Sequence, residues 1–471
     1  MSKYICNTCG NIYDEEKEGK NWQELPDDWE CSVCESGKSL FDQDEPSPGT
    51  TPAGVKTVEI STDRYLGEWE RPSDEQEPHM ADIHRMAETG ESIPEPMRTN
   101  ETVCTQWDNI YVKGAQLAKI PLNEDIDVNV QTVIGPKAKQ PLVIETPLYV
   151  THMSFGALSK EAKLALAKGS AAVKTAMCSG EGGILPESLA EAYRYVFEYV
   201  PNLYSVTDEN LRRVDAIEIK IGQSAKPGMG GHLPARKVTR EIAEIRGYPE
   251  GHDIISPAHF EDIANRDDLK RKIAWLRDRS GGKPIGIKLA AGNIEADLDV
   301  ALYAEPDFIT LDGRAGGTGS APKFVKSAAS VPTIFALYRA RKFLDERKAN
   351  DVSLLITGGL RVSSDFAKAL AMGADAVAIG TAAMMAIGCQ QYRSCHTGKC
   401  PVGISSHDPE LRKRLDVEKS AERLTNFMKV CTEELRGFAR MTGNDDVKGL
   451  SVKDLCTMNS EISEYTSIEH V

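Results

Sequence analysis

Short apolar strands, glycine-containing loops and helical segments alternate along this chain from Leu148 onwards, over roughly 240 residues. The predicted strands are Leu148–His152, Thr175–Cys178, Ile217–Ile221, Asp253–Ile255, Ile285–Leu289, Phe308–Leu311, Val352–Ile356 and Ala374–Ile379. The predicted helices between them include Ser159–Val173, Leu189–Val200 and Ala328–Asn350. This alternation predicts an α/β protein whose parallel sheet closes into a (β/α)8 barrel of the TIM type, rather than a doubly wound sheet.

Two late strands of the predicted barrel end in glycine. Gly358-Gly359 follow Val352–Ile356, and Gly380-Thr381 follow Ala374–Ile379. Because glycine has no Cβ, backbone N–H groups at such turns can close on an anion near the start of a helix. The late loops of (β/α)8 barrels commonly bind phosphate in this way, so we expect a phosphate-bearing ligand here.

Three cysteines follow directly in one loop. Cys389, Cys395 and Cys400 have the spacing C-x5-C-x4-C, and Pro401 comes next. The N-terminus, MSKYICNTC, has no apolar export signal, so we expect a cytoplasmic protein whose thiols remain reduced. Three thiolates in a short loop then indicate an iron–sulfur cluster rather than disulfides.

Residues 1–43 predict a separate small metal module. Two C-x2-C pairs, Cys6/Cys9 and Cys31/Cys34, offer four thiolates in a tetrahedral arrangement, which suits zinc or iron. So short a segment cannot bury enough apolar surface to fold without a metal. A zinc ribbon is the structural alternative, but four aromatic residues, Tyr13, Trp22, Trp29 and Phe41, are many for a zinc ribbon of this length.

The rest of the chain is divided by composition. Residues 44–56 are rich in Pro, Gly and Thr and predict a flexible linker. Residues 57–145 form a pre-barrel segment, in which 61–99 predicts surface helices and loops. The barrel takes residues 146–411, and residues 412–471 form a C-terminal helix, predicted over Glu418–Gly443, and a polar tail. The net charge of −15, with no basic run, argues against nucleic-acid or membrane partners.

The N-terminal motifs CxxCGxxYD and LPDDWxCxxC resemble rubredoxin over nearly the whole module. The resemblance implies one mononuclear iron, held by Cys6, Cys9, Cys31 and Cys34, that transfers one electron at a time. Ser32 stands where rubredoxins usually have proline, and Glu35 where they usually have glycine.

Residues 148–411 resemble the synthase domain of glutamate synthase. The motifs that carry the resemblance occur in the family's order: MSFGALSKEA, SGEGG, EIKIGQSAKPGMGGHLP, ISPAHFEDI, GGTGSAP, GGLR and CHTGKCPVGI. The resemblance implies FMN, a three-iron (3Fe-4S) cluster and the reductive amination of 2-oxoglutarate with ammonia. It also implies an external electron donor, such as ferredoxin or an NAD(P)H-dependent reductase.

The resemblance assigns site residues one by one. Cys389, Cys395 and Cys400 match the cluster ligands, and Gly358, Gly359, Gly380 and Thr381 match the flavin-phosphate loops. The other expected flavin-site residues are Ser154, Gly156, Gln223, Lys288, Gly316 and Gly317. Lys220 matches a lysine beside the flavin ring and Lys226 a lysine that binds a substrate carboxylate; these two and Glu181 are the predicted catalytic residues.

Departures from the family pattern leave the substrate open. Met229, His232 and Arg314 replace family residues that we expect around the substrate pocket, as do Phe260 and Glu261. One alternative is an FMN reductase on the same barrel that acts on another imine or an unsaturated acid. Another is an electron-transfer protein without a substrate of its own. No glutaminase nucleophile precedes the module, so we expect ammonia to arrive free or from another subunit; the oligomeric state, a homo-oligomer included, stays open.

Overall fold

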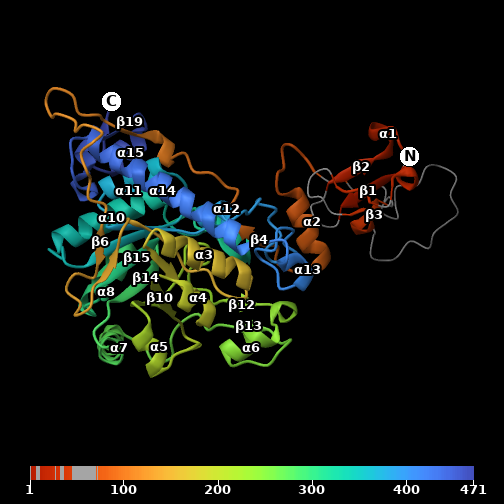
Figure 1. The fold of residues 1–471 in the computed structure, drawn as a ribbon, viewed down its shortest axis with the longest axis horizontal. Coiled ribbons are helices and arrows are strands. Elements are labelled where there is room, and N and C mark those ends of the chain that lie inside the picture. The colour runs from red at the N-terminus through yellow and green to blue at the C-terminus, as the bar shows by residue number, and fades with distance from the viewer. Residues whose placement is uncertain (1, 7–10, 27, 32–36, 45–70, 72) are drawn as a thin grey trace. The chain divides into compact units, whose positions relative to one another are not determined.

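The computed structural model describes residues 2–6, 11–26, 28–31, 37–44, 71 and 73–471. The chain divides into two compact units, Met1–Ile93 and Pro94–Val471. Figure 1 follows the elements along the chain from the red N-terminal strands to the blue C-terminal helices. Of the predicted linker, only Asp44 is described, and residues 45–56 lie outside the described residues.

The first unit contains a three-stranded antiparallel sheet in the order β2-β1-β3. Its strands are β1 (Lys3–Cys6), β2 (Ile12–Asp14) and β3 (Phe41–Asp44), and the short helix α1 (Glu15–Glu18) follows β2. Aromatic rings fill the space beside the sheet: Trp22 stacks on Tyr4 with ring centroids 4.4 Å apart, and Trp29 meets Phe41 edge to face at 5.3 Å. Helix α2 (Met80–Thr89) also belongs to this unit.

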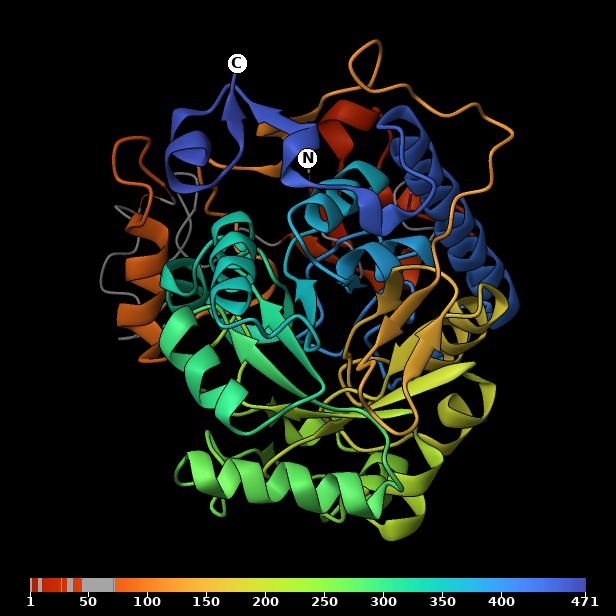
Figure 2. The same cartoon turned by 90° about the vertical axis from the view of Figure 1, so that its left-hand side faces the viewer.

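The second unit is built on a closed barrel of eight parallel strands, in the order β10-β11-β14-β15-β17-β18-β8-β9. Its strands are β8 (Leu148–Val150), β9 (Ala176–Cys178), β10 (Arg194–Tyr199), β11 (Ala216–Lys220), β14 (Ile285–Ala290), β15 (Phe308–Asp312), β17 (Ser353–Thr357) and β18 (Ala376–Ile379). Figure 2 shows the helices surrounding these strands. The predicted (β/α)8 fold class is confirmed.

Two sequence assignments were wrong. The third barrel strand is β10, which occupies the end of the segment Leu189–Val200 that we predicted as a helix; only α4 (Pro186–Glu191) is helical there. The β-branched and aromatic residues of RYVFEY fit a buried strand better than a helix. Ile254–Ile255, predicted as part of a barrel strand, forms β13 and pairs with β12 (His232–Leu233) in a two-stranded antiparallel sheet.

Most of the other helices of this unit lie between the barrel strands along the chain or follow them. They are α3 (Lys160–Ala172), α5 (Asp208–Arg213), α6 (Arg240–Arg246), α7 (Arg266–Arg279), α8 (Ile294–Tyr303), α9 (Lys323–Ala328), α10 (Thr333–Glu346), α11 (Ser363–Ala371), α12 (Thr381–Ala386) and α13 (Pro409–Arg412). The predicted C-terminal helix is α14 (Val417–Met441), which packs on α3. Gly169 permits this close approach, because a Cβ there would lie 2.9 Å from the carbonyl oxygen of Ala421.

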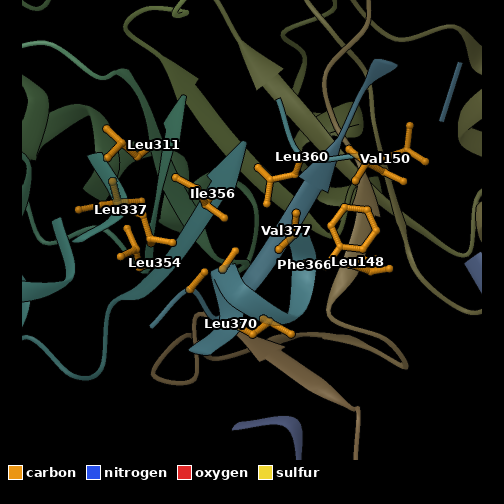
Figure 3. Close-up of a cluster of buried hydrophobic side chains, with 14 of the residues drawn as sticks. Leu148, Val150, Leu311, Leu337, Leu354, Ile356, Leu360, Phe366, Leu370 and Val377 are labelled. Atoms are coloured by element: carbon orange, nitrogen blue, oxygen red, sulfur yellow. The ribbon is translucent and has the colours of Figure 1, made fainter. Parts of the chain in front are cut away.

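The main core lies between the strands and these helices. Alternate strand residues face outward, so that Leu354 and Ile356 of β17 and Val377 of β18 meet Phe366 and Leu370 of α11 (Figure 3). Each of these five side chains is at most 7% exposed. Burial on this scale stabilises the fold by about 1.5–3 kcal/mol per large aliphatic side chain.

The strand residues that point the other way fill the barrel interior. Leu355 and Phe308 belong to this inner cluster, which also contains Ile134 and Leu142 from the hairpin β6 (Thr132–Ile134) and β7 (Leu142–Ile144). Gly286 leaves room for the Phe308 ring, since a Cβ there would lie 2.1 Å from it. The interior is therefore packed with side chains and is not a pore.

Segments before and after the barrel pair with each other or with its loops. Strand β4 (Pro94–Met97) pairs antiparallel with β16 (Thr318–Pro322), in the loop after β15. Strand β19 (Leu455–Thr457) lies between β5 (Ile110–Val112) and β20 (Glu469–His470), and α15 (Ser460–Tyr465) joins β19 to β20. The predicted polar tail is thus partly ordered structure. Among the described helices, none combines the length and apolar character needed to cross a membrane.

Candidate functional site

A single cavity gathers the loops that follow the barrel strands. The predicted residues that line it are Ser154, Glu181, Lys220, Gln223, Lys226, Lys288, Gly316, Gly317, Gly358, Gly359, Gly380, Thr381, Cys389, Cys395 and Cys400. Among the site residues predicted in the barrel, Gly156 is the one that is not a described lining residue of the cavity. Its carbonyl oxygen instead lies 2.8 Å from His407 Nε2.

The turn after β17 requires glycine at both positions. Gly358 has φ +112° and Gly359 has φ +90°, in the region that favours glycine. A Cβ on Gly358 would lie 2.3 Å from the carbonyl oxygen of Gly313. Thr333 Oγ1 donates a hydrogen bond of 2.6 Å to the Gly358 carbonyl and fixes the turn. The backbone at this turn can therefore approach a ligand closely.

Two further groups beside this turn favour an anion. Helix α12 begins at Thr381, and the first N–H groups of a helix have no acceptor within it. Arg361 lines the cavity three residues after Gly358. Burial lowers the pKa of its guanidinium to about 10, helped by the nearby charge of Arg98, and the group stays charged at neutral pH. Phosphate is a suitable ligand for such an arrangement.

The loops after β11 and β15 hold each other in place. Ser224 Oγ donates to Asp312 Oδ1 at 2.8 Å, and the Ser224 N–H donates to Asp312 Oδ2 at 3.0 Å. Gly316 packs against this pair, because a Cβ there would lie 2.2 Å from Ser224 Oγ. The side chain of Gln223 reaches towards the same loop, with its Nε2 3.5 Å from Thr318 Oγ1. The loop that carries Gln223 and Lys226 is therefore rigidly positioned.

Two lysines and a glutamate form the polar side of the cavity. Lys220 Nζ donates to Glu181 Oε2 in a close ion pair. Burial alone would raise the pKa of Glu181, but the charge and hydrogen bond of Lys220 outweigh it and hold the pKa at about 2. Lys226 is 8% exposed and its Nζ donates to the Gly230 carbonyl at 2.8 Å. Burial lowers the pKa of Lys226, and Glu181 partly opposes that shift.

A charged cluster lies deeper in the barrel, at the ends of β8, β10, β11 and β14. His152 Nε2 lies 2.9 Å from Glu218 Oε2 and its Nδ1 lies 3.7 Å from Glu198 Oε2. The ligand atoms of these three residues lie within 4.8 Å of one another, as in a metal site. Lys288 Nζ, however, lies 3.5 Å from Glu198 Oε1 and supplies a cation from the chain itself. Burial would lower the pKa of Lys288, but Glu198 and then Glu218 raise it above its ordinary value.

The cysteine loop follows α12, and its three thiols face the same cavity. Cys395 Sγ lies 3.7 Å from Met97 Sδ at the end of β4, and Gln391 Nε2 donates to Cys389 Sγ at 3.2 Å. Burial raises the pKa of Cys395 to about 11, and Cys400 and Cys389 add to the shift. The three thiols are therefore close enough to repel one another as thiolates, and positive iron would reverse that effect.

The N-terminal module buries two of its four predicted ligands. Cys6 and Cys31 are each 1% exposed and pack in the aromatic cluster described above. Asn11 Nδ2 lies 3.5 Å from Cys31 Sγ. Cys9 and Cys34 lie outside the described residues.

Sequence reasoning missed several residues that line the cavity: His152, Glu198, Lys237, Arg246 and Asp312. Glu198 was missed because its strand, β10, was predicted as a helix, so no inward direction could be assigned to it. We expected the residues that depart from the family pattern to lie around the substrate pocket, and this expectation was wrong in part. His232 lines the cavity, whereas Met229 and Arg314 are not among its described lining residues, and Phe260 stacks on Tyr199 with ring centroids 5.6 Å apart.

A closed barrel with a glycine turn, buried lysines and a three-cysteine loop in one cavity is typical of a flavin-dependent redox enzyme. The conserved region of glutamate synthase matches residues 76–445, and rubredoxin matches residues 3–41. The chain therefore belongs to the glutamate synthase family and carries an N-terminal rubredoxin domain.

Relatives support this assignment along most of the chain. The glutamate synthase large subunit-like protein of Rhizobium meliloti is 36% identical over 411 residues, 83% of this chain and 92% of that protein. The archaeal glutamate synthase (NADPH) of Methanocaldococcus jannaschii is 36% identical over 401 residues, 78% of each. Among solved structures, a mandelate oxidase variant with an FMN adduct covers 74% of this chain and 88% of its own, at 17% identity and a TM-score of 0.48.

Proposed function

We propose that this protein makes glutamate from 2-oxoglutarate and free ammonia, with two electrons and two protons consumed and one water released. One observation carries the proposal: a single cavity brings together the glycine turn, the lysines Lys220 and Lys226, and the three cysteines. The proposed compartment is the cytoplasm, and neither nucleic acid nor a membrane takes part.

The glycine turn and its surroundings fit FMN. Gly358, Gly359, Gly380 and Thr381 would hold the phosphate, with Arg361 as a cation nearby, because a side chain at Gly358 would fill the space of the turn. Bound FMN supplies a centre that accepts single electrons and delivers two to a substrate. Lys220 would stabilise negative charge on the reduced ring. Since the pKa of Glu181 is about 2, its carboxylate stays ionised and serves to position Lys220.

The cysteine loop fits a three-iron cluster. Three thiolates match three irons, whereas a fourth iron would need another ligand. Cys389, Cys395 and Cys400 would be those ligands, because all three line the cavity. Burial, and then the neighbouring Cys400, raise the pKa of the Cys389 and Cys395 thiols. The N-terminal Cys6, Cys9, Cys31 and Cys34 would hold the single iron expected of a rubredoxin domain.

Lys226 is the proposed anchor for a carboxylate of 2-oxoglutarate. Its charge is buried, and among the described residues its ammonium group donates to one acceptor, the Gly230 carbonyl, so donors remain for a substrate. His232 lies at the same cavity, 2.8 Å from Asp253, and is the departure from the family that can alter substrate choice.

The N-terminal module would deliver electrons to the barrel from an external donor, a ferredoxin or an NAD(P)H-dependent reductase. A linker of roughly 14 residues keeps the module at about millimolar effective concentration, so that docking need not be tight. The reduced form of the module would carry one electron at a time, and two deliveries complete one turnover.

The test is reoxidation of the reduced flavin. The full-length protein is reduced with dithionite without oxygen, and 2-oxoglutarate with ammonium is added. We expect the flavin to reoxidise and glutamate to form, and glutamine not to replace ammonium. Lys226→Ala should raise the KM for 2-oxoglutarate at least about tenfold, as the loss of a charge-assisted contact implies, with flavin content unchanged. Lys342→Ala, at an exposed position on α10, is the matched control.

Two results would change the assignment. If saturating 2-oxoglutarate and ammonium never reoxidise the flavin, the substrate is another imine or an unsaturated acid. If no small acceptor reoxidises it while a redox protein does, the barrel is an electron relay.

A further inference from the structure

Lys237 is a buried cation beside the cysteine loop, and the proposed function gives it no role. It ends the 3-10 helix η5 (Ala235–Lys237), which follows β12, and it is 5% exposed. Its Nζ lies 3.2 Å from the carbonyl oxygen of Cys395 and 3.5 Å from that of Ala157. Its stem also passes Gly398 of the same cysteine loop, where an added Cβ would lie 3.5 Å from Lys237 Cγ.

These two carbonyls do not account for a buried charge. Ser405 Oγ already donates to both of them, at 2.6 Å to Ala157 and 3.3 Å to Cys395. Within the described part of the chain, no carboxylate lies within ion-pair distance of Lys237. A buried ammonium group without a counter-ion is strongly unfavourable, so an anion is expected to complete the site.

Three other buried lysines of this unit show the contrast. Lys220 pairs with Glu181, and Lys288 lies 3.5 Å from Glu198. Lys326, which ties β4 to the barrel through three carbonyls, also has a carboxylate, Glu95, at 2.7 Å. The groups near Lys237 that become anionic when they bind iron are instead the thiols of Cys395 and Cys400, in the loop whose Cys395 carbonyl it contacts.

We propose that Lys237 is the counter-ion of the cluster bound by Cys389, Cys395 and Cys400, and that its charge raises the reduction potential of that cluster. This inference rests on the cluster of the proposed function. One-electron reduction adds one negative charge to the cluster. A fixed positive charge beside it stabilises the reduced form more than the oxidised form, which favours electron acceptance from a donor such as the N-terminal module.

The alternative is a mechanical role, in which Lys237 only links the loop after β8 to the cysteine loop. A neutral donor could make those two hydrogen bonds. Lys237→Gln keeps a donor and removes the charge, whereas Lys237→Arg keeps both. Lys399→Gln removes an exposed charge beside Cys400 in the same loop and controls for solvent-screened charge effects.

The experiment is a redox titration of the full-length holoenzyme with dithionite, in which the spectrum of the oxidised cluster is followed by electron paramagnetic resonance. For Lys237→Gln we expect the reduced-to-oxidised ratio at a fixed potential to fall about tenfold, a shift of about −59 mV for a one-electron couple. Lys237→Arg and Lys399→Gln should stay close to the wild type. Iron and flavin contents are measured on each sample.

An unchanged potential in Lys237→Gln, with full cluster content, would overturn the inference. If Lys237→Gln loses the cluster and Lys237→Arg retains it, the charge is required to hold the cluster, which supports the counter-ion role. If both variants lose it equally, the role is mechanical and the inference fails. A wild-type protein without a three-iron cluster would instead refute the cofactor set of the proposed function.

Discussion

Replacing Gly358 with alanine tests the proposed phosphate turn at a single atom. The new Cβ meets two obstacles. The first is the backbone, because φ +112° lies where alanine is strained by about 1–2 kcal/mol. The second is the carbonyl oxygen of Gly313, which would lie 2.3 Å from the Cβ. That oxygen cannot move freely, because it accepts the Gly316 N–H at 3.1 Å.

The expected loss of folding stability in Gly358→Ala is the sum of these two costs. Overpacking against backbone adds about 1–3 kcal/mol, so Gly358→Ala should destabilise the barrel by roughly 2–5 kcal/mol in total. Gly247→Ala is the matched control, since Gly247 ends α6 with φ +71° and a Cβ there would meet no atom within 4 Å. It carries the backbone strain alone, about 1–2 kcal/mol.

Calorimetry of the barrel transition and flavin content after gel filtration provide the assay. We expect Gly358→Ala to lose most of its flavin, because relief of the collision moves the turn, whereas Gly247→Ala keeps its flavin. If Gly358→Ala binds flavin normally and is destabilised no more than Gly247→Ala, the turn does not form the phosphate site.

Three further outcomes are expected. Burial lowers the pKa of His407 to about 4, against 6.5 in the unfolded chain. As the pH falls, the unfolded chain therefore binds the proton first. About 3 kcal/mol of the free energy of unfolding is lost between pH 6.5 and pH 4. Unfolding titrations of His407→Asn should lack that part of the pH dependence. Removal of residues 1–45 should leave dithionite-driven turnover unchanged and slow turnover with the physiological donor, and equal rates would assign the module another role. Metal analysis should find about one iron beyond the cluster per chain, and zinc in its place would refute the rubredoxin-type iron.

The barrel was predictable because its strands are short apolar runs that end in glycine. Seven of the eight predicted strands coincide with barrel strands. The failure at β10 has a physical cause: Arg194–Tyr199 follows a helical turn without a glycine or proline between them, and local pattern alone does not separate a buried strand from a buried helix. The antiparallel pairing of β13 with β12 is a tertiary contact that no local pattern specifies.

The site residues also divide into those that the sequence predicts and those that only the fold reveals. Cysteines at fixed spacing are informative alone, whereas the glycine loops are informative only in combination; the three cysteines and all of the predicted glycines except Gly156 line the cavity. His152, Glu198 and Lys237 are single residues of common types, and their meaning depends on which face of a strand or loop turns inward. Only the closed barrel brings Glu198 of β10 next to Lys288 of β14.

The charges of the cavity follow from the ligands proposed for it. The chain as a whole carries a net charge of −15, yet Lys226, Lys237 and Arg361 all line the cavity without a carboxylate in ion-pair contact among the described residues. Each faces a different proposed anion: the substrate dicarboxylate, the thiolate cluster and the flavin phosphate. Local cations attract such ligands against the repulsion of the whole protein, and the attraction weakens with ionic strength. Anions that bind beside these three cations would explain why an acidic chain keeps three positive charges in this cavity without a carboxylate partner.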